Sequence, residues 1–292
     1  MQSAIVPGIL MLIVIGIASF TFHFVGAYQK RKKPRSPLTC DVLRGPGHTH
    51  SAQITELSQD LQVCQIALFA LPCLAFATHA AYSYFAQVPE SWFRILISVG
   101  TTLLFMGYYL WRLVRLLSGR RMCRLRLEAE VTVGQELNLL MTDGYRVFHD
   151  FPADQFKIDH IVIGPTGVMV VETKTRGHNR QADAVVAYDG RMLHFPKVSD
   201  YETIDQANLK AEWISEWLSS TIGEDVCARA MVAVPGWSVK RTSADGIPVV
   251  NPKQFATLFK YIKPRPMTDG LMQHIVKQIE GRCRDEEPLE SR

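Results

Sequence analysis

The sequence predicts an α/β domain with a mixed central sheet flanked by helices, preceded by three transmembrane α-helices. Three observations support this class. Long apolar segments fill most of the first 118 of the 292 residues, an apolar hairpin pattern lies near the middle of the chain, and short apolar strands then alternate with amphipathic helices. A chain of this length accommodates a membrane part and a separate soluble domain.

Three apolar segments make up the membrane part. They cover residues 4–28, 61–86 and 92–117, and each exceeds the roughly 20 residues that a helix needs to cross a bilayer. The first two contain no Asp, Glu, Lys or Arg, and the arginines of the third lie near its ends, where their side chains can reach the interfaces. We therefore expect the lipid bilayer to be one partner of this chain.

Basic clusters predict the orientation of these helices. One cluster covers residues 30–35, directly after the first segment, and another follows the third segment. The second cluster consists of Arg112, Arg115, Arg120 and Arg121. Because Lys and Arg collect on the cytoplasmic side of a membrane, we expect a multi-pass protein of the inner (plasma) membrane whose C-terminal domain is cytoplasmic.

Residues 29–60 are predicted to form a cytoplasmic linker between the first and second segments. His48 and His50 lie in this linker. A His-x-His pair can bind a metal ion, but two histidines in a solvated loop are the favoured interpretation. His79 is polar at membrane depth, which fits either a functional role or packing against a neighbouring helix.

Charge is unevenly distributed along the chain. The formal net charge is +4, but residues 1–122 hold 11 Lys and Arg against 4 Asp and Glu (+7), which leaves −3 for residues 123–292. The basic excess belongs to the membrane part and does not indicate a basic nucleic-acid-binding domain. The six cysteines form no Cys-x-x-Cys pair, which argues against zinc and favours reduced thiols.

The soluble part begins and ends with helices, and strands dominate between them. Gly144 ends the first helix, and Asp189-Gly190 is a strong two-residue turn signal between two short strands. Helices are predicted at residues 123–145, 203–220, 252–262 and 269–278, and strands at 145–149, on both sides of the hairpin turn at 164–167, and at 184–188, 191–195, 229–234 and 248–250. This order predicts a mixed sheet.

The most informative segment covers residues 158–175, which has the pattern of a β-hairpin around a Gly-Pro-Thr-Gly turn. If Ile163 and Val168 close the hairpin, Asp159 lies directly opposite Glu172, with Cβ atoms roughly 5 Å apart. Lys174 is two residues beyond Glu172 and points to the same face. The rest of the hairpin is apolar on both faces, as expected of a central strand pair.

Two carboxylates at this separation repel each other unless a cation lies between them. A hard divalent ion such as Mg²⁺ or Mn²⁺, with oxygen ligands and retained waters, meets that requirement. Lys174 would then lie beside the metal, within reach of a phosphate or a water. The competing interpretation is that Asp159, Glu172 and Lys174 are ordinary charged residues on the solvent face of a hairpin.

Three further features are candidates for the same site. Glu136 lies on the first helix of the soluble part and can supply a third carboxylate, although a solvated glutamate fits its spacing equally well. Gln206 lies at the edge of the apolar stripe of its helix, where it either reaches the site or stays at the surface. The polar segment 176–183 has two arginines and a histidine, which suit phosphate contacts or an ordinary exposed loop.

The order of three short motifs resembles the nuclease-related domain (NERD), which is grouped with the PD-(D/E)XK nuclease superfamily. These motifs are Gly134-Gln135-Glu136, Asp159-His160 and Glu172-Thr173-Lys174. The resemblance covers residues 128–262 and implies a restriction-endonuclease-like fold, in which a mixed central sheet is flanked by helices.

The resemblance also implies roles for individual residues. Asp159, Glu172 and Glu136 correspond to metal-binding acidic residues, Lys174 to a catalytic lysine, and Gln206 to a glutamine on the helix after the sheet core. The expected reaction is hydrolysis of phosphodiester bonds in nucleic acid, with DNA as the substrate and Mg²⁺ or Mn²⁺ as the cofactor.

The predicted organisation has five parts: a transmembrane helix at 1–28, a linker at 29–60, a transmembrane hairpin at 61–118, a nuclease-like domain at 119–265, and a C-terminal helix with a charged tail at 266–292. The expected function is that of a membrane-anchored, metal-dependent nuclease. One alternative is a non-catalytic module that binds nucleic acid or protein at the membrane. Another is a membrane sensor or transport accessory whose second and third apolar segments carry the function.

Overall fold

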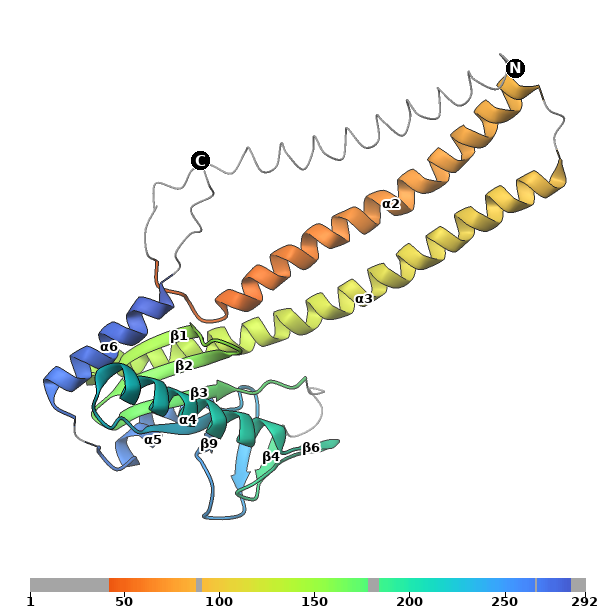
Figure 1. Ribbon diagram of the computed structural model, residues 1–292. Coiled ribbons are helices and arrows are strands. Elements are labelled where there is room, and N and C mark those ends of the chain that lie inside the picture. The colour runs from red at the N-terminus through yellow and green to blue at the C-terminus, as the bar shows by residue number, and fades with distance from the viewer. Residues whose placement is uncertain (1–41, 88–90, 178–183, 266, 285–292) are drawn as a thin grey trace, which may run out of the picture. The chain divides into compact units, whose positions relative to one another are not determined.

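The computed structural model describes residues 42–87, 91–177, 184–265 and 267–284, and it divides into two compact units (Figure 1). The described part of the first unit lies in Thr55–Arg120, whereas the second unit joins Cys40–Ile54 to Arg121–Arg292. Thr55–Arg120 is thus inserted into the sequence of the second unit. The apolar segment predicted at residues 4–28 lies outside the described residues.

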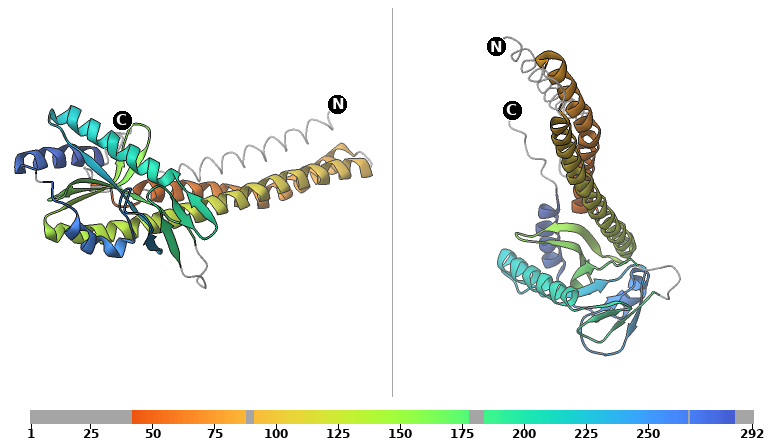
Figure 2. Two further views of the ribbon diagram at one scale, coloured as in Figure 1. Left: turned by 90° about the horizontal axis from the view of Figure 1, so that it is seen from below. Right: turned by 90° about the vertical axis from the view of Figure 1, so that its right-hand side faces the viewer.

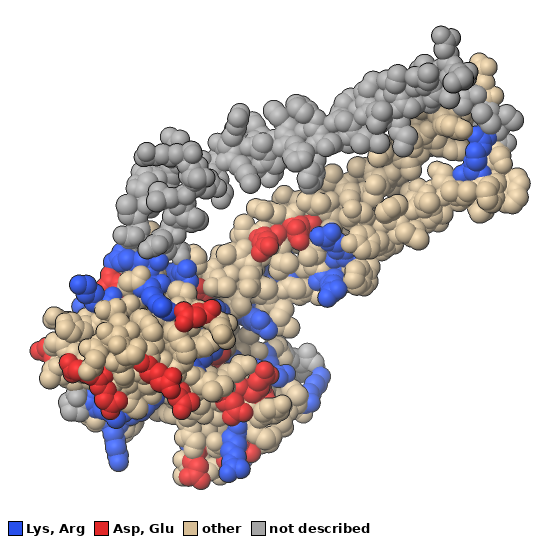
Figure 3. Space-filling view, in the orientation of Figure 1, with Lys and Arg blue, Asp and Glu red and all other residues tan. Residues whose placement is uncertain are grey.

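Two long helices, α2 (His48–Ala86) and α3 (Trp92–Asn138), provide the described part of the first unit. An ion pair between Asp60 and Arg112, with an N–O distance of 3.8 Å, joins them. Both helices are long and apolar enough to cross a membrane. Large apolar side chains point outward along them, and Figure 3 shows mostly uncharged atoms over their length. The second and third apolar segments are therefore confirmed as helices of suitable length and composition.

The ends of both helices differ from the predicted ones. α2 begins at His48 rather than near residue 61, so the solvated loop predicted for residues 48–60 is wrong. α3 continues to Asn138 rather than stopping at residue 117 and restarting at 123. No proline interrupts residues 118–122, so nothing removes a helical hydrogen bond there. A short 3₁₀ helix, η1, extends α3 as far as Gly144, whose φ of +85° suits a glycine after a helix end.

The second unit is built on a five-stranded mixed sheet with the strand order β1-β2-β3-β7-β9 (Figure 1). β1, β2 and β3 pair antiparallel, whereas β7 and β9 continue the sheet in the parallel sense. The strands are β1 (Arg146–Pro152), β2 (Lys157–Gly164), β3 (Gly167–Thr173), β7 (Ala228–Ala233) and β9 (Val249–Val250). The predicted mixed sheet is confirmed.

The hairpin of β2 and β3 has the predicted register. Ile163 pairs with Val168, and the pairing continues to His160 and Val171. Every residue of β2 after Lys157 is buried, and so are the first five residues of β3, although alternate side chains point to opposite faces. The two strands therefore form the centre of the sheet, as their apolar composition indicated.

A smaller sheet lies beside the central one and has the strand order β6-β5-β4-β8. The predicted hairpin around Asp189-Gly190 is confirmed, because β4 pairs antiparallel with β5 across this turn. β6 and β8 were not predicted, since neither is a continuous apolar run. The strands are β4 (Val185–Tyr188), β5 (Leu193–Phe195), β6 (Val198–Asp200) and β8 (Ser238–Arg241).

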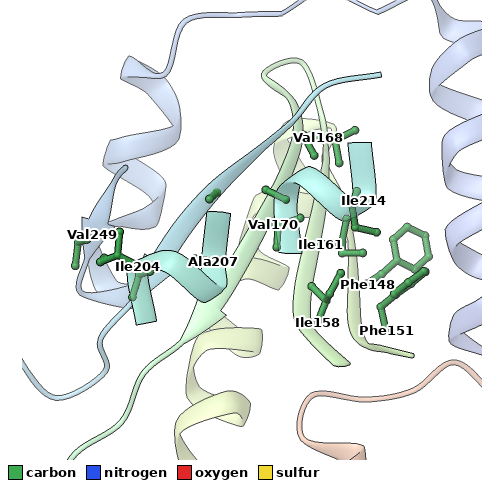
Figure 4. Close-up of a cluster of buried hydrophobic side chains, with 14 of the residues drawn as sticks. Phe148, Phe151, Ile158, Ile161, Val168, Val170, Ile204, Ala207, Ile214 and Val249 are labelled. Atoms are coloured by element: carbon green, nitrogen blue, oxygen red, sulfur yellow. The ribbon is translucent and has the colours of Figure 1, made fainter. Parts of the chain in front are cut away.

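Two apolar clusters cover the two faces of the central sheet. On one face, α4 (Glu202–Ile222), α6 (Asp269–Cys283) and the smaller sheet pack over the strands. Figure 4 shows α4 side chains such as Ile204, Ala207 and Ile214 directed at residues of the sheet. Most α4 residues in this cluster recur every three or four positions, which is the spacing of an amphipathic helix.

The opposite face is covered by the end of α3, by η1 (Leu139–Asp143) and by α5 (Phe255–Tyr261), which follows the short helix η2 (Pro252–Gln254). The left view of Figure 2 shows α4 and the end of α3 on opposite sides of the strands. The second unit is therefore a three-layered α/β domain.

Candidate active site

Asp159 and Glu172 come together where the hairpin leaves the core. The Asp159 side chain accepts a hydrogen bond from the backbone N–H of Thr173, with an N–O distance of 2.8 Å, and so reaches across from β2 to β3. Burial, followed by the negative charge of Asp159, raises the pKa of Glu172 to about 7. The structure therefore brings the two predicted carboxylates together, and each senses the other's charge.

Two lysines neutralise part of this acidic pair, in an arrangement that differs from the predicted one. Lys210, from α4, places its Nζ 2.6 Å from Glu172. Lys157, from β2, lies 3.4 Å from Asp159. Lys174 instead pairs with Asp200, at 2.6 Å. Lys174 lines the same pocket as the two acids, but the lysines closest to them are ones that the hairpin pattern did not identify.

Asp200 links Lys174 to the start of α4. Its Oδ1 accepts hydrogen bonds from the backbone N–H and the hydroxyl of Thr203 in the first turn of that helix. Burial alone would raise the pKa of Asp200, but the hydrogen bonds from Lys174 and Thr203 lower it to about 2. Lys174 is thus held by a carboxylate that stays ionised at neutral pH.

Lys157 is the cation of a second, more deeply buried group of acids. Its Nζ lies 2.8 Å from both carboxylate oxygens of Glu130 and 3.1 Å from Asp150. Burial alone would lower the pKa of Lys157, but the charges of Asp159, Glu130 and Asp150 raise it above its ordinary value. One ammonium group therefore connects the candidate site to two further carboxylates.

Asp150 has an unusual backbone conformation that explains its position. Its φ is +51°, a left-handed value that Asp tolerates better than most residues. Regular alternation would place Phe148 and Phe151 on opposite faces of β1, yet both belong to the same apolar cluster. The left-handed residue between them shifts the alternation and turns the Asp150 carboxylate toward Lys157.

The third predicted carboxylate does not reach the site. Glu136 is partly buried on α3, but the residues that line the pocket include Glu130 and not Glu136. Glu130 and Glu136 are six residues apart on α3, which is one full turn of the helix plus about two thirds of another. The two glutamates therefore face different directions. Gln206 does line the pocket, where it is exposed and donates to Glu202 of its own helix.

The site opens into a pocket of about 700 Å³. Six Lys or Arg side chains and three Asp or Glu side chains line it, which gives a formal charge of +3. The basic residues are Arg126, Lys157, Lys174, Arg176, Lys197 and Lys210. This local excess contrasts with the −3 of residues 123–292, so the distribution of charge along the sequence did not reveal a basic pocket.

A divalent cation fits the residues that surround Asp159 and Glu172. Four carboxylates and two lysines form the connected cluster, so with neutral histidines its formal charge is −2. Its members are Glu130, Asp150, Asp159, Glu172, Lys157 and Lys210. The described residues contain no group of three or more His, Cys, Asp or Glu arranged to hold a metal. Two adjacent carboxylates would suit an ion such as Mg²⁺, which accepts one or two carboxylates and keeps several waters.

The fold and the pocket define the class of this domain: an α/β domain with a mixed sheet, whose candidate site pairs two acidic residues with lysines. Residues 126–235 match the family model described as the nuclease-related domain, NERD. The predicted resemblance is confirmed over these residues, which include all five predicted site residues. The searches of curated proteins and of solved structures returned no match.

Several residues of the site could not be found from the motifs. Lys157 precedes Asp159 by two residues on the same strand, so strand alternation was a usable signal for it. Lys210 lies four residues after Gln206 and therefore on the same face of α4. Glu130 gave no local signal and His50 only that of a His-x-His pair, because the packing of α2 and α3 against the sheet is what brings both to the pocket.

Proposed function

We propose that this chain is a metal-dependent nuclease that hydrolyses phosphodiester bonds in DNA. One observation carries the proposal: within the NERD match, Asp159 and Glu172 lie together in a pocket that is basic overall. A phosphodiester needs positive charge around its oxygens, and a metal needs acids. The mixed sheet flanked by helices also supports the restriction-endonuclease-like fold that such nucleases share.

In the proposed mechanism, Asp159 and Glu172 would hold one Mg²⁺ or Mn²⁺ ion. When bound, the ion supplies Lewis acidity and lowers the pKa of a water molecule that serves as the nucleophile. Asp200 fixes the ammonium group of Lys174, which would donate a hydrogen bond to a phosphate oxygen. Lys210 favours the ionised form of Glu172, the form that binds a cation, against the larger opposing effects of burial and of Asp159.

The outer part of the pocket supports binding of the sugar-phosphate backbone. Arg126 and Lys197 are exposed and line the pocket from two different elements, so both are accessible to a nucleic-acid strand. Their contribution would be electrostatic and independent of sequence. We therefore expect cleavage to weaken as the salt concentration rises.

Purified full-length protein in detergent tests this proposal. We expect it to cleave linear, circular or single-stranded DNA when Mn²⁺ is present, and Asp159→Ala, Glu172→Ala and Lys174→Ala each to lower the rate by about a hundredfold or more, since each removes a group that acts on the reacting phosphate. Glu216→Ala and Lys260→Ala provide matched controls, because both residues are exposed and do not line this pocket. Full activity in all three site variants would refute the assignment.

One observation favours a second candidate function, a non-catalytic module that binds nucleic acid or protein at the membrane. Lys157 and Lys210 already lie beside the two carboxylates, so the acids can be stable without a metal. Calorimetric titration with Mg²⁺ and Mn²⁺ separates the two functions. Binding that vanishes in Asp159→Ala supports the nuclease, whereas no binding at millimolar metal supports the module.

We further propose that α2 and α3 anchor the chain in the inner (plasma) membrane, with the domain on the cytoplasmic side. The apolar, outward-facing side chains of both helices support an anchor, and the arginine cluster of α3 supports the orientation. Alkaline phosphatase fused to the C-terminus should be inactive, and a fluorescent protein at the same position should be bright. Active phosphatase there would contradict the orientation.

A further inference from the structure

The first turn of α2 belongs to the same compact unit as the site and contributes a side chain to its pocket. His50 lines the pocket, and its side chain is only 8% exposed. Its Nε2 lies 3.1 Å from an oxygen of Glu130, and its Nδ1 lies 3.1 Å from the side-chain oxygen of Gln53. Both ring nitrogens therefore have a partner, and the ring is fixed in one orientation.

Several contacts hold this turn against the domain. Asp150 accepts hydrogen bonds from the backbone N–H and the hydroxyl of Thr49, at 3.1 and 2.6 Å, and so caps the start of α2 from the neighbouring strand. Gly134 lets Pro46 approach α3 closely, since a Cβ at this glycine would lie 2.6 Å from the proline ring. The position of His50 is thus set by packing on both sides of it.

We propose that His50 is a positioning residue of the site, which orients Glu130 and thereby controls how Lys157 is shared with Asp159. This inference rests on the proposed function. Lys157 lies closer to Glu130, at 2.8 Å, than to Asp159, at 3.4 Å. Glu130 therefore draws the ammonium group away from Asp159 and leaves that carboxylate available to a metal ion.

His50 lies outside residues 126–235, the part that matches the nuclease-related domain. The pocket of the matched domain thus includes one residue from the first turn of α2, a helix long and apolar enough to cross a membrane. Without His50, Glu130 would be free to turn away, and Lys157 would pair more closely with Asp159. Lys157 would then compete with the divalent cation for this carboxylate.

Full-length protein in detergent tests the inference through Mn²⁺ binding by calorimetry and through DNA cleavage. We expect His50→Ala to weaken Mn²⁺ binding and to slow cleavage by about tenfold, the lower end of the effect usual for groups that lie behind metal ligands. His50→Gln should recover most of both, because its amide can donate to Glu130. His274→Ala, an exposed histidine of α6, should behave as wild type.

A double-mutant comparison separates positioning from a general structural effect. If His50 acts through Glu130, then His50→Ala should have no further effect on the Mn²⁺ Kd in a Glu130→Gln background. Additive losses, or wild-type Mn²⁺ binding in His50→Ala, overturn the inference and leave the proposed function intact. If the wild type binds Mn²⁺ without cutting DNA, and His50→Ala weakens that binding, the inference stands and the nuclease proposal fails. A wild type that neither binds nor cuts overturns both.

Discussion

Lysines, rather than further acids, complete the candidate site at the scale of single residues. Lys157 and Lys210 each pair with one of the two central carboxylates, and Lys174 pairs with Asp200. The pKa of Glu172 nevertheless remains raised to about 7, because burial and the charge of Asp159 outweigh these contacts. The charged form of Glu172 is therefore electrostatically costly, and a nearby cation would lower that cost.

Asp150 should be one of the most sensitive residues for stability. It is fully buried and accepts hydrogen bonds from Thr49 and Lys157. Asp150→Ala removes the acceptor of both Thr49 donors and one of the three carboxylates around Lys157, and it places alanine at a φ of +51°, so we expect a loss of about 3 kcal/mol or more in the free energy of unfolding. Asp150→Asn should lose less, because asparagine tolerates this φ and still accepts hydrogen bonds.

Urea unfolding in detergent, followed by tryptophan fluorescence, measures this difference. Asp154→Ala is the control, since Asp154 is exposed and its contact with Arg282 is 3.5 Å long. Equal losses for Asp150→Ala and Asp154→Ala would show that the buried carboxylate is not important for stability.

A buried pair of histidines predicts a loss of stability in acid. Asn138, His149, His160 and Thr173 form a chain of side-chain contacts of 2.9 to 3.2 Å. Burial lowers the pKa of His149 to about 4 and that of His160 to about 3, so the folded state takes up protons less readily than the unfolded state. Stability should therefore fall as the pH drops from about 6.5 toward 4, by about 1–2 kcal/mol per histidine at pH 5.

The melting temperature measured between pH 8 and pH 5 tests this dependence. His149→Gln should reduce the slope by about half, since one of the two histidines no longer titrates. His274→Ala should keep the full slope, because His274 is exposed on α6. A flat profile in the wild type would show that the pair is not held in its neutral form.

At the scale of elements, the central hairpin was predictable and the third acid was not. A turn of fixed length sets the register of β2 and β3, so Ile163, Val168 and their apolar neighbours were enough to place Asp159 beside Glu172. The choice between Glu130 and Glu136 depends on how α3 is rotated against the sheet. That rotation follows from long-range packing, which no local pattern reports.

Gly134 illustrates this packing. In an exposed helix, Gly→Ala stabilises by about 1 kcal/mol through helix propensity. At Gly134, however, the new Cβ would meet the rigid ring of Pro46, and overpacking of this kind costs about 1–3 kcal/mol. We therefore expect Gly134→Ala to destabilise the protein and to increase proteolysis before residue 54.

The matched control for Gly134 is Gly281 of α6, which has no atom within 4 Å of the position of a new Cβ. Gly281→Ala should leave the melting temperature unchanged or raise it. The prediction for Gly134 fails if both substitutions shift the melting temperature in the same direction.

At the scale of the whole molecule, the second unit is discontinuous in sequence. The segment Cys40–Ile54 packs with Arg121–Arg292, although the first unit separates them along the chain. A fragment of residues 119–292 would lack Thr49 and His50, and would leave Asp150 and Glu130 with Lys157 but without these two contacts. We expect this fragment to melt at a lower temperature than the domain in the full chain, and to bind Mn²⁺ more weakly.

Adding the missing segment to this fragment as a separate peptide is the direct check. A peptide of residues 40–54 should raise the melting temperature of fragment 119–292, because a ligand that binds only the folded state stabilises it by mass action. The same peptide with His50→Ala and Thr49→Val should have a smaller effect. An unchanged melting temperature with both peptides would contradict this account of the second unit.

The two places where the chain leaves and re-enters the second unit are neighbours. Gln53 and Cys123 lie one on each side of the inserted hairpin, and their side chains are in contact, with an S–O distance of 3.7 Å. A short linker of glycine and serine residues could therefore join Ile54 to Arg121 in place of the apolar segment Thr55–Arg120. If it also begins at residue 40, such a shortened chain lacks all three apolar segments and should be water-soluble without detergent, which would allow crystallisation and spectroscopy of the second unit with every pocket residue retained.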